Sequence, residues 1–242
     1  MSFPDLFSGH AKLYAAARPT YPERTIAELA ALAPGRGLAW DCGTGNGQAA
    51  RLLAGHFASV VATDASAEQI AQAEPHDRVR FAVEAAEDCS LPDASCDLAL
   101  AAQCIHWFDL DRFYAQVRRV LKPGGIVAAL GYGWSFVDPE VDALVARNFL
   151  APLDSYWAAG NRLIMEGYRT IPFPGEEVRL SPAAIHLAWT GRQFAGLIRS
   201  WSATQKLGEA ALADAFAKLA ALWPDDQQRH VVMPLVSRVA RL

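Results

Sequence analysis

The chain contains 242 residues, of which 52% are hydrophobic and 20% are charged, and this composition excludes a disordered protein. Its 22 Lys and Arg residues against 26 Asp and Glu give a net charge of −4. This balance argues against a protein that binds nucleic-acid backbones, because such binding needs a concentrated basic face. The length suits one large domain with its own core.

Five short apolar runs in the first half of the chain predict buried strands. Their continuous rather than alternating apolar character is typical of parallel strands covered on both faces. The runs are Leu38–Asp41, Val60–Asp64, Val79–Val83, Leu98–Gln103 and Ile126–Gly131. Helical patterns lie among them, at Asn46–Phe57, Ser66–Ala73 and Asp109–Leu121. This alternation predicts a parallel sheet whose strand-end loops share one edge, which is where ligands bind in such sheets.

The pattern changes after Gly133. Three later segments have helical character, at Pro139–Tyr168, Gly191–Ser202 and Glu209–Trp223. The segment Glu177–Thr190 has strand character in its later part, and His230–Leu242 predicts a final strand. The proline in that last strand, Pro234, is expected at a sheet edge or a bulge because proline cannot donate to a strand ladder.

A glycine-rich turn lies between the first predicted strand and its helix, in the sequence LAWDCGTGNGQAA. Gly43, Gly45 and Gly47 permit a tight turn and close approach of a ligand to the backbone. Asp64 ends the next strand, 21 residues after Gly43, where an acidic side chain accepts hydrogen bonds from a ribose. The combination predicts a site for a nucleoside cofactor.

Two features distinguish NAD from S-adenosylmethionine as that cofactor. Asp41 precedes the glycines, and a carboxylate there repels a pyrophosphate but suits a cation. Dinucleotide sites of the pattern G-x-G-x-x-G have a third glycine where this chain has Gln48. Both features favour S-adenosylmethionine, which carries a sulfonium and an ammonium group and no phosphate. An NAD(P)-dependent oxidoreductase stays open as an alternative enzyme.

Longer segments resemble the class I S-adenosylmethionine-dependent methyltransferases of small molecules, the type 11 and trans-aconitate methyltransferase-like group. The similar segments are WDCGTGNGQAA, VVATDAS, VEAAEDCSLPDASCDLALAAQCIHWFD and FYAQVRRVLKPGGIVAAL, within roughly residues 36–131. The resemblance implies an α/β, Rossmann-like fold with a seven-stranded, mostly parallel sheet flanked by helices and an antiparallel last strand. We expect one methyltransferase domain, 1–242, made of an N-terminal lid segment (1–35), a cofactor-binding core (36–133), a helical substrate cover with one strand (134–228) and a final strand (229–242).

The resemblance also assigns residues to the cofactor. The glycine loop is expected along the methionine part, Asp64 on the ribose, Glu87 near the adenine and Arg18 on the carboxylate. The alternatives are that Asp41 only supports the loop and that Glu87 is a solvated loop residue. The expected cofactor-binding residues are Tyr14, Arg18, Tyr21, Asp41, Gly43, Gly45, Asp64, Ala65, Ala86, Glu87 and Gln103.

His106, which follows the fourth predicted strand, is the candidate catalytic residue. Methyl transfer needs alignment and exclusion of water, and a hydroxyl acceptor also loses a proton, for which histidine is a suitable base. A histidine in the apolar sequence HWF is also explained as a packed structural residue. The residues expected on the substrate are His106, Trp107, Trp134, Arg162 and Trp201.

The later half of the chain is expected to supply the substrate pocket. Its aromatic residues and arginines suit aromatic walls with a cationic clamp, in which an arginine holds a carboxylate with two hydrogen bonds. The alternative is that Arg199 and Trp201 only pack a helix onto the sheet. The candidates are Trp134, Trp157, Arg162, Tyr168, Arg169, Arg199 and Trp201.

We therefore predict methyl transfer from S-adenosylmethionine to a small molecule, at a carboxylate or a hydroxyl. The segment QCIHWF lacks the Asn/Asp-Pro-Pro-aromatic signature of enzymes that methylate nucleic-acid bases. A non-catalytic module that binds S-adenosylmethionine is a second alternative, because fold does not guarantee activity.

We also expect a cytoplasmic monomer or homodimer with no nucleic-acid or membrane partner. The sequence shows neither a signal peptide nor an apolar run of about 18 residues. Its four cysteines form no CxxC pair and stand beside no histidine cluster. This pattern predicts reduced thiols and no metal site.

Overall fold

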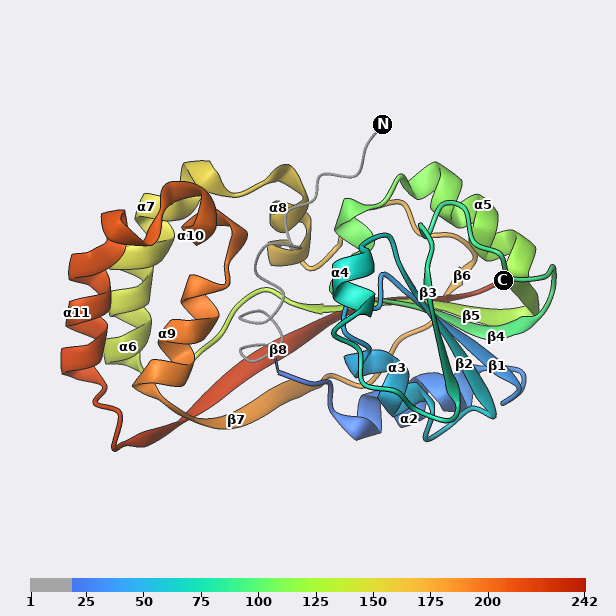
Figure 1. The fold of residues 1–242 in the computed structure, drawn as a ribbon, viewed down its shortest axis with the longest axis horizontal. Coiled ribbons are helices and arrows are strands. Elements are labelled where there is room, and N and C mark those ends of the chain that lie inside the picture. The colour runs from blue at the N-terminus through green and yellow to red at the C-terminus, as the bar shows by residue number, and fades with distance from the viewer. Residues whose placement is uncertain (1–18) are drawn as a thin grey trace.

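The computed structural model describes residues 19–242, and Figure 1 shows a twisted sheet with helices on both faces and a helical region beside it. The strands are β1 (Leu38–Cys42), β2 (Ser59–Asp64), β3 (Val79–Val83), β4 (Cys96–Ala102), β5 (Leu121–Tyr132), β6 (Glu176–Glu177), β7 (Ala184–Thr190) and β8 (Gln228–Arg241). The α-helices are α2 (Glu23–Leu32), α3 (Gln48–Leu53), α4 (Ala67–Ile70), α5 (Leu110–Val120), α6 (Pro139–Val145), α7 (Ala151–Leu153), α8 (Ala159–Met165), α9 (Gly191–Arg199), α10 (Ser202–Leu207) and α11 (Ala213–Leu222).

The sheet follows the order β3-β2-β1-β4-β5-β8-β6. Neighbours among β1 to β5 are parallel, and β8 runs antiparallel to β5. This order confirms the predicted mostly parallel sheet with an antiparallel last strand. An eighth strand, β7, pairs with the other half of β8 and extends the sheet away from the parallel strands.

The strands β1, β2, β4 and β5 are buried on both faces, which explains their continuous apolar sequences, whereas the edge strand β3 is only partly buried. Alternate residues of one strand enter different core clusters, so Ala39 and Leu98 pack with α2 and α3, whereas Trp40 and Ala99 pack with α5. Figure 1 shows these helices on opposite sides of the sheet. The carboxyl ends of β1, β2 and β4 are thereby held at one edge by two apolar core clusters.

The amino-terminal edge of the sheet is fixed by one buried carboxylate. Asp97, at the start of β4, accepts hydrogen bonds from the backbone N–H groups of Gly37 at 2.8 Å and Leu38 at 3.0 Å. Its other oxygen forms an ion pair with Lys122 Nζ at 2.8 Å. The side chain is only 2% exposed, so the three donors replace the water that a carboxylate requires. Asp97 therefore ties β1, β4 and β5 together below the core.

The long strand β8 connects the two parts of the molecule (Figure 1). Its first half pairs with β7, ending at the pair Ala184↔Pro234, and its second half pairs with β5, starting at Tyr132↔Leu235. Pro234 therefore lies where β8 changes partners, a position that tolerates the missing N–H donor.

The predicted helical stretch Pro139–Tyr168 is divided in the structure. Helix α6 continues into a π-helical turn over Ala146–Leu150, then into α7 and a short 3-10 turn at Asp154–Tyr156, before α8 begins. Pro152 has no N–H for an intrahelical bond, and the widened turn directly precedes it. The break directs α8 back toward the carboxyl edge of the sheet.

Among residues 19–242, no helix combines the length and apolar character needed to cross a membrane. The same part of the chain contains no cluster of three or more His, Cys, Asp or Glu side chains placed to bind a metal ion. Cys42, Cys89, Cys96 and Cys104 are all free thiols.

Candidate active site

The glycine loop turns sharply after β1 because its glycines adopt left-handed backbone conformations. Gly43 has φ +64°, and a Cβ there would lie 2.9 Å from Cys104 Sγ. Gly47 has φ +85°, and a Cβ there would lie 2.7 Å from the Phe81 ring. Only glycine meets both the backbone and the space requirements at these positions. The sequence prediction of a tight glycine turn is confirmed.

A cavity of about 1020 Å³ lies over this loop, at the carboxyl ends of β1, β2 and β4, and we call it the glycine-loop cavity. Its lining includes the predicted residues Tyr21, Gly43, Gly45, Asp64, Ala65, Ala86, Glu87 and Gln103. Tyr14 and Arg18 lie outside the described residues. The structure thus brings together residues from five separate segments at the edge where ligands bind in such sheets.

Asp64 is held at the wall of this cavity by backbone donors. Its Oδ2 accepts a hydrogen bond from Gly45 N at 2.8 Å, and its Oδ1 accepts one from Ser66 N at 2.9 Å. Burial raises the pKa of Asp64, although both backbone hydrogen bonds oppose the rise. The carboxylate therefore fixes the glycine loop to the end of β2, and lone pairs on the same oxygens suit ribose hydroxyls.

Asp41 lies beneath the glycine loop and is not among the residues that line the cavity. Its side chain is fully buried and accepts a hydrogen bond from Thr44 Oγ1 at 2.5 Å. Burial raises its pKa to about 7 and outweighs the hydrogen bonds from Thr44 and from the Ala50 backbone. Asp41 therefore supports the glycine loop from below, and its expected contact with the cofactor stays a prediction.

The acidic character of the cavity comes instead from other residues. Asp64, Glu84 and Glu87 line it, whereas no Lys or Arg does so among residues 19–242. A pyrophosphate would meet like charges on these walls, and a cationic ligand would meet opposite charges. Asp64, Glu84 and Glu87 therefore give the cavity walls a negative charge, which favours a cationic ligand without phosphate.

Gln103 separates this cavity from a second one, and it lines both. Its Nε2 donates to Tyr132 O at 2.9 Å, and its Oε1 accepts from Tyr132 N at 2.9 Å. Its backbone has φ +62°, which is strained for a residue with a side chain. The strained turn aims the amide at the end of β5 and fixes the boundary between the cavities.

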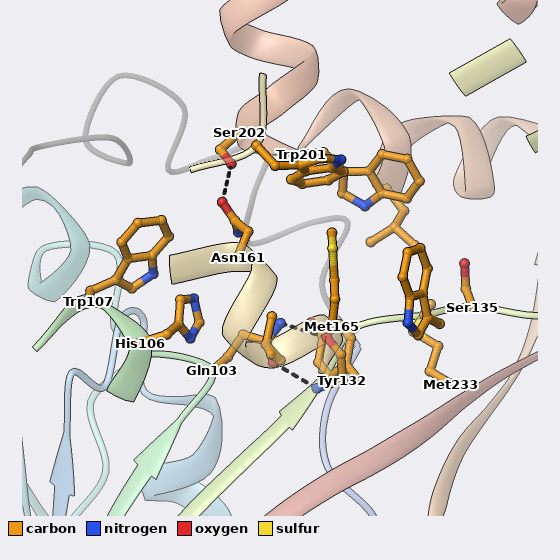
Figure 2. Close-up of a pocket in the computed structure, with 15 residues that line it drawn as sticks. Gln103, His106, Trp107, Tyr132, Ser135, Asn161, Met165, Trp201, Ser202 and Met233 are labelled. Carbon is orange, nitrogen blue, oxygen red and sulfur yellow. Dashed lines mark hydrogen bonds between the residues drawn. The ribbon is translucent and has the colours of Figure 1, made fainter. Parts of the chain in front are cut away.

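The second cavity, which we call the tryptophan cavity, is open to solvent, has a volume of about 640 Å³ and lies between the 3-10 turn Ile105–Trp107, β5, α8 and α10. Figure 2 shows aromatic side chains around it, together with Asn161, Met165 and Ser202. The rings of Trp157 and Trp201 pack with centroids 5.6 Å apart. The predicted residues His106, Trp107, Trp134 and Trp201 all line this cavity.

The predicted cationic clamp is not found among the described residues. Arg162 is exposed and turned to Asp154, with its Nη2 donating to Asp154 O at 2.9 Å. Arg199 forms an ion pair with Glu209 at 2.7 Å. Neither these arginines nor Arg169 lines the tryptophan cavity. Oxygens of Asp154 and Glu209 hold the guanidinium groups of Arg162 and Arg199, and the expected contact of Arg162 with substrate stays a prediction.

Several polar and apolar lining residues were missed by the sequence analysis. Asn161 accepts a hydrogen bond from Ser202 Oγ at 3.1 Å and thereby links α8 to α10. Met165 and Met233 complete the apolar wall. No local pattern singles out these residue types, since the cavity is formed only when α8 and α10 pack together.

Comparisons with known proteins identify the family of this chain. Residues 40–129 match the family model of a methyltransferase domain. A Dictyostelium discoideum protein whose name assigns it to the methyltransferases is 32% identical over 204 residues, which cover 83% of this chain and 78% of that protein. A solved structure from Anaeromyxobacter dehalogenans, described as a type II methyltransferase, is 43% identical, has a TM-score of 0.85, and is matched over 93% of this chain and 97% of that one. A Saccharomyces cerevisiae protein named for S-adenosylmethionine-dependent methyl transfer is 31% identical over 132 residues, 51% of this chain and 44% of its own length.

The sheet order and the glycine-loop cavity define an α/β enzyme domain that binds its cofactor at the carboxyl ends of parallel strands. With these relatives, the chain belongs to the class I S-adenosylmethionine-dependent methyltransferases. The family implies S-adenosylmethionine as the cofactor, and the alternative of an NAD(P)-dependent oxidoreductase is set aside.

Proposed function

We propose that the chain transfers a methyl group from S-adenosylmethionine to a hydroxyl group of a small acceptor in the tryptophan cavity. The observation that carries this proposal is the adjacency of the two cavities, which share Gln103, Trp107 and Tyr132. S-adenosylmethionine supplies a methyl group activated by a positively charged sulfur. The two cavities would hold donor and acceptor on opposite sides of Gln103.

The residues of the glycine-loop cavity suit this cofactor. The backbone of Gly43 and Gly45 would hold the methionine part, and Asp64 the ribose. Ala65, Ala86 and Glu87 would surround the adenosine, with Tyr21 and Gln103 toward the reacting methyl group. Three acidic side chains line the walls, and none of the described lining residues is a Lys or Arg. This charge supports binding of a sulfonium and an ammonium group. Tyr14 and Arg18 are proposed cofactor contacts from the family resemblance alone.

The walls of the tryptophan cavity favour a neutral, planar acceptor over a carboxylate. Trp107, Trp134, Trp157 and Trp201 supply flat apolar surfaces. No Lys or Arg in the described part of the chain lines this cavity, so nothing there pairs with a carboxylate. A hydroxyl acceptor must lose a proton, and of the two titratable side chains among the described lining residues, His106 and Tyr132, histidine is the suitable base near neutral pH. We therefore propose His106 as the general base.

A direct test combines cofactor binding with an acceptor screen. Calorimetric titration with S-adenosylhomocysteine and with NADH is expected to show binding of the first and not of the second. Screening neutral phenols, small carboxylic acids and amines with labelled S-adenosylmethionine is expected to give methylation of phenols. Methylation confined to carboxylic acids would contradict the proposed acceptor, and cofactor binding with no turnover on any class would favour a non-catalytic module.

The substitution Asp64→Ala is expected to weaken S-adenosylhomocysteine binding roughly tenfold to a hundredfold, which is what the loss of hydrogen bonds to a charged group produces. Asp64 would lose both its ribose contacts and its bond to Gly45 N. Calorimetry measures the change. Asp77→Ala, at an exposed position in the β2–β3 connection, is the matched control and should bind like the unaltered protein. Equal affinity of the two variants would exclude Asp64 from the cofactor site.

A further inference from the structure

We infer that Tyr168 is a positioning residue for His106: its hydroxyl oxygen accepts a hydrogen bond from Nδ1–H, which leaves Nε2 as the unprotonated nitrogen that takes a proton from the acceptor. This inference rests on the proposed role of His106. His106 Nδ1 and Tyr168 Oη lie 2.9 Å apart, and the two rings are stacked at 29° with centroids 5.9 Å apart. Tyr168 does not line the tryptophan cavity, so it reaches the acceptor only through His106.

The backbone of Tyr168 is held in an unfavourable conformation. Its φ is +57°, in the left-handed region that residues with side chains rarely adopt. Its N–H donates to Leu163 O at 2.8 Å, and Arg238 Nη1 donates to Tyr168 O at 2.9 Å. The ring itself is completely buried. Contacts from α8 and β8 therefore impose a backbone strain whose result is to aim this hydroxyl at His106.

The neighbouring strand leaves room for that hydroxyl. Gly131, near the end of β5, has no side chain, and a Cβ there would lie 3.1 Å from Tyr168 Oη and 2.6 Å from Ile164 Cδ1. Glycine weakens a strand interior and often marks a close approach by another group. Here the approaching groups include the Tyr168 hydroxyl. Gln103 Oε1 lies in the same space, 3.1 Å from that Cβ position. The absence of a side chain at Gly131 therefore makes room for both the Tyr168 hydroxyl and the Gln103 amide oxygen.

The chemistry requires one particular tautomer. Neutral imidazole carries one proton, and only the nitrogen without it can act as a base. If Nδ1 carries the proton and donates it to Tyr168 Oη, Nε2 has a lone pair. When Nε2 takes the acceptor proton, the imidazolium keeps its bond to Tyr168, and a bond from a charged donor is the stronger one. Tyr168 thus favours both the reactive tautomer and the protonated product of the transfer.

Nitrogen-15 NMR of the full chain, saturated with S-adenosylhomocysteine, tests this assignment. The ring signals of His106 are identified by their absence in His106→Gln. We expect the Nδ1–H tautomer to dominate in the unaltered protein. In Tyr168→Phe, which removes only the hydroxyl, the tautomer ratio should shift toward Nε2–H by roughly threefold to tenfold, as expected for the loss of one hydrogen bond.

Tyr114→Phe is the matched control, because Tyr114 is also buried in this core and donates to Pro172 O at 2.7 Å, outside both cavities. It should leave the His106 signals unchanged. An Nε2–H tautomer in the unaltered protein, or identical His106 signals in Tyr168→Phe, would overturn the proposal. Calorimetry with S-adenosylhomocysteine on the same samples reports cofactor binding separately, so failure of the proposed function is recognised independently of the tautomer.

Discussion

Asp41→Asn is expected to stabilise the protein at pH 8 and to leave its stability at pH 4 nearly unchanged. In the folded state the pKa of Asp41 is about 7, whereas its ordinary value is 3.8. Between pH 4 and pH 7 the native state binds the Asp41 proton more tightly than the unfolded chain does. The stabilising contribution of Asp41 is therefore fully present below about pH 4 and is lost as the pH rises through 7. The difference between the two pKa values of Asp41 corresponds to a contribution on the order of 4 kcal/mol to the free energy of unfolding.

Asparagine is a neutral isostere that keeps an oxygen for Thr44 and cannot ionise. Subtracting the unfolding free energies of the two proteins at each pH isolates Asp41 from the other titrating groups. Urea unfolding between pH 4 and pH 9 measures this difference, which should grow through pH 7 and then level off. A difference that stays constant across the range would show that burial does not raise the pKa of Asp41.

Asp97→Ala is expected to destabilise the protein by roughly 2–4 kcal/mol, because a buried charged acceptor of three hydrogen bonds is removed. The substitution leaves the Gly37 and Leu38 N–H groups without their acceptor and separates Lys122 from its partner. Urea unfolding at pH 7 measures the loss. Asp93→Ala removes a carboxylate that is 79% exposed and paired with Arg119, and should cost less than about 1 kcal/mol.

The pH dependence of Asp97 has the opposite sign to that of Asp41. Burial by itself raises the pKa of Asp97, but Lys122 and the two backbone donors outweigh burial and hold that pKa below its ordinary value. Its stabilising contribution is therefore present above about pH 4 and lost as the pH falls through the lowered pKa. An Asp97→Ala variant with the same deficit at pH 2.5 as at pH 7 would contradict this account.

The parallel half of the fold is predictable from the sequence because four of its five strands, β1, β2, β4 and β5, are buried on both faces. A residue such as Trp40 or Leu98 enters one core cluster or the other, so the whole run is apolar and stands out. The later half is less predictable. Whether Pro152 ends a helix or only widens it depends on what the following turns pack against.

The candidate site likewise contains one part that the sequence predicts and one part that it does not. Gly43, Gly47 and Asp64 are defined by local geometry within one strand–helix–strand unit, β1–α3–β2, and the sequence indicates each of them. The tryptophan cavity depends on the packing of distant segments, and an arginine that binds Asp154 has the same local sequence features as one that binds a ligand. The role of Tyr168 depends on a contact between residues 62 positions apart, which no local pattern reveals.

The change of partners along β8 constrains how this enzyme can be recombined. Removing the chain from Gln228 onward would strip the partner from β5 and expose a 12-residue edge strand, which is a template for aggregation. Residues 134–228 include β7, whose partner strand is the first half of β8. Transplanting residues 134–228 alone would therefore separate β7 from its own partner, and substrate selectivity cannot be exchanged in that way. A chimera between relatives must take the first half of β8 with the donor's cavity and the second half with the recipient's sheet, which places the crossover point at Pro234.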